Sequence, residues 1–164
     1  LMALALKSHE EVTMQASVRA FSLTEAFMDV QAALRAQTHA LEGSAQGQHH
    51  DLDAAFDRVN VTYFGGATQR PRLIWSRRPT RRKLGHYDQI QDTVLVSMSL
   101  DAADVPAFVI DFVVYHEMLH RQLGTTVVNG RRNAHTPEFH KRERAFKDYD
   151  RAQAFLGARD REMD

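Results

Sequence analysis

Two histidines four residues apart, with a glutamate directly after the first, are the residues best suited to chemistry in this sequence. They are His116, Glu117 and His120, in the stretch YHEMLH. On a helix, side chains at this spacing share one face with Cβ atoms about 5–6 Å apart, so both imidazoles can reach one zinc ion at about 2.0–2.1 Å. Glu117 is turned off that line and can face a metal-bound water. This is the H-E-x-x-H arrangement of zinc metalloproteases.

The plainer interpretation makes His116 and His120 hydrogen-bonded histidines of the core. It would bury two imidazoles and a carboxylate in one apolar stripe, which is costly when they have no partner. We therefore expect a metal site, with His116 and His120 as ligands and Glu117 as the catalytic general base.

A catalytic zinc site needs a third protein ligand and leaves its fourth position to water. The metzincin pattern, H-E-x-x-H-x-x-G-x-x-H, fails because Leu123 and Thr126 stand where its glycine and last histidine belong. Four downstream residues carry suitable donor atoms: His135, Glu138, His140 and Glu143. The motif by itself leaves the choice among them open.

The elements that must position these residues follow from apolar periodicity and from capping residues. Helices are expected over residues 13–41, 51–63, 101–123 and 136–156. Short strands are expected over residues 72–76, 85–89 and 93–97, and loops over residues 42–50 and 125–135. The motif lies on the third helix, which is apolar on most sides, has Pro106 near its first turn and ends at Gly124. Thr136 and Pro137 open the last helix as its N-cap and first residue.

These elements predict an α+β fold with N-terminal helices, a three-stranded antiparallel sheet, the motif helix and a closing helix. An N-terminal helical segment, residues 1–50, is expected to pack on a metalloprotease domain formed by residues 51–164. The sequence has nine histidines and no cysteine, which excludes disulfides, thiol catalysis and zinc ribbons. No apolar run approaches the roughly 20 residues of a membrane span, and the first residues lack the features of a signal peptide. We expect a cytoplasmic protein.

The motif and its surroundings resemble the SprT-like, or Spartan-type, zinc metalloproteases. Their pattern is HExxH, a loop and then H-G-P-E-F opening a helix; here HTPEFH begins at His135, fifteen residues after His120. Upstream stretches match the family's order of one helix and three strands, so the resemblance covers roughly residues 56–146. These stretches are NVTYFGG, LIWS, LGHY and residues 94–99.

The resemblance implies a minimal zincin-like domain with bound Zn²⁺, in which His135 is the third ligand and proteins, in this family also proteins bound to DNA, are cleaved. This sequence differs from the family pattern in two ways. Thr136 replaces the usual glycine after the third ligand. This sequence also contains no Cys-rich zinc module of the kind many members carry, so partner recognition by such a module is not implied.

A basic block interrupts a sequence whose net charge is zero. It holds seven basic residues and no acid: Arg70, Arg72, Arg77, Arg78, Arg81, Arg82 and Lys83. Such residues can neutralise DNA phosphates, and Trp75 could stack on an unpaired base. The plainer interpretation is a solvated strand and loop with Trp75 in the core.

Together these features predict a zinc-dependent endopeptidase in which Glu117 takes a proton from water and returns it to the leaving amine. The strand at residues 93–97 is expected to present a sheet edge to which an extended peptide adds. Two alternatives remain. One is a nucleic-acid-binding module with a structural zinc, against which Glu117 argues, and the other is a small-molecule metallohydrolase with a deep closed pocket.

Overall fold

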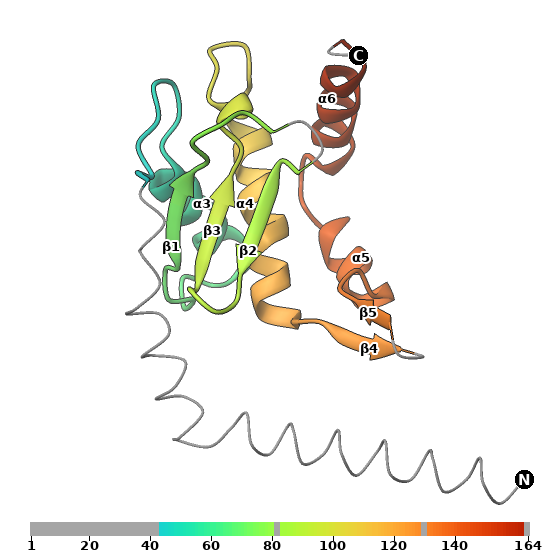
Figure 1. Ribbon diagram of the computed structural model, residues 1–164. Helices are drawn as coiled ribbons and strands as arrows, with labels where there is room; N and C mark the ends of the chain where they lie inside the picture. Colours follow the sequence, from blue (N-terminus) through green and yellow to red (C-terminus); the bar gives the residue numbers. More distant parts are fainter. Residues whose placement is uncertain (1–42, 81–82, 129–130, 163–164) are drawn as a thin grey trace, which may run out of the picture. The chain divides into compact units, whose positions relative to one another are not determined.

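The computed structural model describes residues 43–80, 83–128 and 131–162 (Figure 1). The helix expected over residues 13–41 lies outside them. Residues from Gly43 onward form a unit by themselves. No helix in the described ranges is long and apolar enough to cross a membrane. The α+β class expected from the sequence is confirmed.

The first described elements are a helix and three short strands. They are α3 (Leu52–Tyr63), β1 (Arg72–Trp75), β2 (Gly85–Asp88) and β3 (Thr93–Val96). Asp51 caps α3, as predicted, because its carboxylate accepts hydrogen bonds from the backbone N–H groups of Asp53 and Ala54. The three strands begin where the sequence placed them.

The sheet is mixed, with strand order β1-β3-β2. β3 pairs parallel with β1 and antiparallel with β2, so the prediction of a purely antiparallel sheet is wrong for the β1–β3 pair. β2 does not lie next to β1 but one strand further away, where neighbouring strands are about 5 Å apart. β3, which follows β2 in the sequence, occupies the position between them. β3 is therefore the central strand, and the edge that we expected at residues 93–97 is formed by β2 instead.

The motif helix α4 (Ala107–Leu123) starts later than the predicted position 101. Pro106 is extended, with φ −68° and ψ 145°, and a short 3-10 turn, η1 (Met98–Leu100), precedes it. Asp101 is instead tied to the loop at residues 43–50, because its carboxylate accepts the N–H groups of three residues, Gln48, His49 and His50. The helix ends at Gly124, with φ 65°, as predicted.

After α4 the structure is more regular than expected. The segment predicted as a loop at residues 125–135 contains a hairpin of β4 (Thr126–Val128) and β5 (Arg131–Asn133). The closing helix is two helices, α5 (Pro137–Glu143) and α6 (Tyr149–Glu162). A turn between them buries Phe146, whose N–H bonds the Glu143 carbonyl. Thr136 caps α5 by accepting the Phe139 N–H, as predicted.

The core lies between the sheet and the helices. α3 and α4 pack on one face of the sheet, where Leu73, Trp75, Val94 and Val96 meet the apolar sides of both helices (Figure 1). A second cluster joins α4 to α5 and α6 through aromatic rings, among them Phe112, Tyr115, Phe139 and Phe146. α4 is thus held on two sides, which fixes the face that carries the motif.

Candidate metal centre

Three histidines bring their ring nitrogens together at one point. His116 and His120 come from α4, and His135 comes from the segment between β5 and α5. The Nε2 atoms of His116 and His120 are 3.1 Å apart, as are those of His120 and His135. The three donor atoms lie within 4.8 Å of one another, the only such group of three or more donors in the ranges described.

This geometry fits a metal ion better than it fits hydrogen bonds. Two nitrogens on one tetrahedral zinc at 2.0–2.1 Å would lie about 3.3 Å apart, close to the 3.1 Å separations here. The Nε2 of His120 faces two other nitrogens, but it has either one hydrogen or one lone pair to offer. A cation facing three lone pairs removes this conflict, and the three imidazoles leave a fourth position open.

The environment favours the neutral form of His120 and His135, the form that a metal ligand needs. Burial lowers the pKa of His120 to about 4, and the neighbouring His116 and His135 add to the effect. The pKa of His135 is also lowered, first by burial and then by His116. Around neutral pH their ring nitrogens carry free lone pairs.

Glu143 orients the ring of His116 by bonding its Nδ1 atom, the ring nitrogen outside the cluster. The Nδ1–H of His116 donates to Glu143 Oε1 at 2.7 Å, which leaves the Nε2 lone pair directed at the other histidines. The second oxygen of this carboxylate is 3.4 Å from His140 Nδ1, and Glu143 is only 5% exposed. Sequence reasoning offered Glu143 as a ligand and missed this role. Its spacing from Phe139 and Phe146, one helical turn to either side, was the signal that it faces inward.

The other two candidate donors do not join the cluster. His140 is half-exposed and bonds Glu143, and its ring centroid lies 5.9 Å from that of His135. Glu138 is an exposed partner of Arg142, at 2.7 Å. Of the four downstream candidates, Glu143 contacts the Nδ1 atom of His116. Only His135 adds a donor atom to the point where those of His116 and His120 converge.

Glu117 is buried against the edge strand β2. Its side chain leaves the line of the two histidines and is 4% exposed. A Cβ atom at Gly85 would collide with its carboxylate oxygen, so a glycine at this point of β2 makes room for it. Burial raises the pKa of Glu117 to about 7, although His116 and a hydrogen bond from the backbone N–H of Tyr87 act in the other direction.

A pocket of about 270 Å³ opens beside this carboxylate. It lies between the start of β2 and the helices α4 and α6, and His116, Glu117 and Glu143 form part of its wall. His135 is exposed, so the histidine cluster is accessible from solvent. The arrangement thus combines three nitrogens that could hold a metal ion, an adjacent carboxylate and a pocket.

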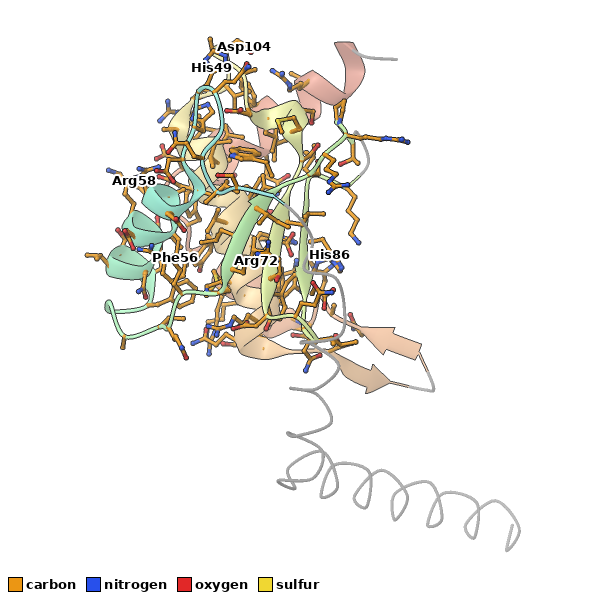
Figure 2. All side chains as sticks on the ribbon, turned by 60° about the vertical axis from the view of Figure 1, so that its left-hand side comes forward. His49, Phe56, Arg58, Arg72, His86 and Asp104 are labelled. Carbon is orange, nitrogen blue, oxygen red and sulfur yellow. The ribbon has the colours of Figure 1, made fainter. Side chains whose placement is uncertain are left out.

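Only some residues of the basic block are exposed to solvent. Trp75 is 3% exposed and donates its indole N–H to the Ala45 carbonyl, so the idea that it stacks on a base is wrong and it belongs to the core. Arg70 forms ion pairs with Asp53 and Asp57. Arg72, Arg77, Arg78 and Lys83 are exposed, whereas Arg81 and Arg82 lie outside the described residues. Arg72 on β1 and His86 on β2 stand at opposite edges of the sheet (Figure 2).

Comparison with known proteins gives one match. A protein-family model described as the SprT-like family matches residues 52–154, well over half of the chain. The matched range includes α3, the whole sheet, the three histidines and Glu117. No curated protein and no solved structure matches the chain.

Proposed function

The chain belongs to the SprT-like family, a metalloprotease-type domain, and from this premise we propose that it is a zinc-dependent endopeptidase. The observation that carries the proposal is the convergence of His116, His120 and His135 beside the buried carboxylate of Glu117. In this assignment the three histidines hold the ion, and Glu143 holds His116 in the tautomer that ligation needs.

The chemistry is divided between the ion and one carboxylate. A zinc ion at this position would polarise the scissile carbonyl and activate water near neutral pH. Glu117 accepts the proton of the attacking water and delivers it to the leaving amine. Its burial beside Gly85 excludes bulk water from one side of the carboxylate, so the proton stays between Glu117 and the reacting atoms.

The edge strand supports an extended peptide as the substrate. Among the described strands, β2 pairs with β3 alone, and it passes directly over Glu117 at Gly85. A peptide that adds to this edge would present its backbone to the site, with main-chain hydrogen bonds giving affinity for many sequences. The solvent exposure of His135 favours such a polymer over the small molecules of a closed metallohydrolase pocket.

A structural zinc is the less well supported alternative. Structural sites are closed by four protein ligands, whereas three donors meet here among the residues described. The nearby carboxylate of Glu117 belongs to no such set.

The decisive experiment compares the wild-type protein with Glu117→Gln at matched zinc occupancy. The variant keeps the shape of the side chain but cannot accept a proton, so cleavage of a reduced, unfolded protein should fall about 10²–10⁴-fold. Zinc content should be unchanged, because all three histidines remain. Equal cleavage rates would refute the role of Glu117 and indicate a contaminating protease. No cleavage by the wild type, with or without DNA, would favour the alternative of a nucleic-acid-binding module with a structural zinc.

We also propose that the substrates include proteins bound to DNA. The exposed arginines and lysine of the basic block support this partner, because such side chains neutralise phosphates and release counterions. Lys83 belongs both to this block and to the pocket beside Glu117, so a protein held on nucleic acid there would be close to the site.

A further inference from the structure

The pocket beside the histidine cluster has a lining that the proposed chemistry does not use. Its apolar residues are Leu84, Phe112, Val113 and Leu156, contributed by the start of β2 and by α4 and α6. Two exposed polar residues, Lys83 and Gln153, also line it. The buried residues Glu117 and Glu143 complete the polar part of the lining. The pocket therefore places apolar walls beside the catalytic carboxylate.

The volume is that of a large apolar side chain. A cavity of about 150 Å³ lined by Leu, Ile and Phe is enough to bind benzene. The pocket here measures about 270 Å³, so it can take the side chain of leucine, methionine or phenylalanine with room to spare.

The charges of the lining argue against a charged occupant. An acidic side chain would meet the carboxyl groups of Glu117 and Glu143. A basic side chain would meet Lys83, and Glu143 is already bonded to His116 and His140. An ion pair with Glu117 would engage the carboxylate that the proposed reaction needs for the attacking water, and burying a charge between apolar walls without a partner is unfavourable.

We propose that this pocket binds an apolar side chain, leucine, methionine or phenylalanine, of the substrate residue next to the scissile bond. The proposal rests on the proposed endopeptidase function and adds a sequence preference to it. The wall formed by Leu156 lies beyond residue 154, where the family match ends.

The first test uses peptides of one unfolded sequence in which the residues flanking the cleaved bond are varied in turn. Ala, Leu, Phe, Lys and Glu are compared by kcat/KM. At one of the two positions, Leu or Phe should exceed Ala, Lys and Glu by about tenfold or more, because even one methylene in an apolar pocket is worth about 10–200-fold. A preference for Lys or Glu, or equal rates for all five, would overturn the proposal.

The second test changes the pocket itself. Leu156→Phe adds volume to its lining and should lower kcat/KM for the Leu peptide at least about tenfold, while changing the Ala peptide less than about threefold. Ala154→Phe is the matched control, because Ala154 is exposed on the same helix and does not line the pocket. Zinc content and thermal melting of both variants show whether they fold. The reciprocal substitution, Leu156→Ala, should shift the preference toward Phe.

A binding measurement separates this proposal from the function on which it rests. The same peptides are bound to zinc-loaded Glu117→Gln protein and followed by fluorescence anisotropy. Tighter binding of the Leu and Phe peptides without any cleavage by the wild type would support the pocket and refute the endopeptidase. Cleavage by the wild type with no apolar preference in rate or binding would refute the pocket alone. Absence of both cleavage and binding would refute both.

Discussion

At the scale of single residues, Glu143 shows how much of a metal site lies outside its ligands. It is a buried carboxylate that meets His116 at 2.7 Å and faces away from the point where the three Nε2 atoms converge. Such partners fix the tautomer and ring orientation of a ligand and raise its basicity. Glu143 therefore belongs to the candidate site although it is not one of the three converging donors.

We predict that Glu143→Gln weakens zinc binding about 10–100-fold. The amide is of the same size but has lost the charge that holds the Nδ1 proton of His116. Affinity is measured by competition with a chromophoric chelator on folded protein. Glu138→Gln is the control, because Glu138 lies on the same helix and pairs with Arg142 instead. Equal affinities of the two variants would show that Glu143 has only a packing role.

The third ligand gives a second prediction at this scale. His135→Ala removes one of the three converging nitrogens and should strip zinc from the protein. His140→Ala should keep most of it, because His140 contacts Glu143 and lies outside the cluster. Metal content of the two purified variants decides the matter, and the opposite result would reassign the ligand to His140.

At the scale of elements, the sequence predicted best where one local signal decides the structure. The caps at Asp51 and Thr136 and the end of α4 at Gly124 follow from single residues and their backbone preferences. The pair His116 and His120 is likewise placed by helical geometry alone, and the resemblance to the family supplied His135.

The remaining features of the fold depend on contacts between residues that are distant in the sequence, and local sequence patterns do not predict such contacts. The order β1-β3-β2 is set by which strand enters the space beside β1. The late start of α4 reflects the bonds from Asp101 to three residues about fifty positions earlier. The break before α6 buries Phe146 among rings from α3 and α4. The position of Glu117 against Gly85 depends on the packing of β2 against α4.

Asp101 supplies a pH prediction for one of these long-range links. Burial acts to raise the pKa of its carboxyl, but hydrogen bonds from the N–H groups of Gln48, His49 and His50 outweigh it, and the pKa is lowered on folding. A lowered pKa means that the carboxylate stabilises the fold above the unfolded value of about 4. That stability is lost as the pH falls through the folded pKa.

Asp101→Asn should therefore lower the free energy of unfolding by about 1–3 kcal/mol near neutral pH. The gap between wild type and variant should close as the pH falls below about 4. Urea unfolding at several pH values, with a chelator present throughout to remove metal effects, measures this. Asp150→Asn, a change at an exposed position in the first turn of α6, is the control. A gap that persists unchanged at low pH would contradict the assignment.

At the scale of the whole molecule, the basic block and the candidate site adjoin each other. The connection between β1 and β2 carries Arg77, Arg78 and Lys83, and Lys83 reaches the pocket beside Glu117. The charge of the chain sums to zero, so the block is a local excess of positive charge and not part of a general one. Binding there would bring a DNA-bound protein to the edge strand.

We predict that changing Arg77, Arg78, Arg81 and Arg82 to Glu weakens binding to single-stranded DNA and flattens its dependence on salt. Zinc content should not change. The control places the same charge change on the helices α5 and α6 and on the turn between them, at Lys141, Arg144, Lys147 and Arg151. Fluorescence anisotropy with labelled DNA at several salt concentrations measures both. If the wild-type protein has no affinity for DNA at low salt, the hypothesis is wrong.

The β4–β5 hairpin separates the third histidine from the other two along the chain. An ion held by all three would therefore act as a removable cross-link between α4 and the start of α5. It would close a loop whose ordering costs entropy when the link is absent. Because such a ligand stabilises only the folded arrangement, free zinc at a hundred times its Kd would add about 2.7 kcal/mol to the stability. Zinc supply would then affect the stability of this protein as well as its activity.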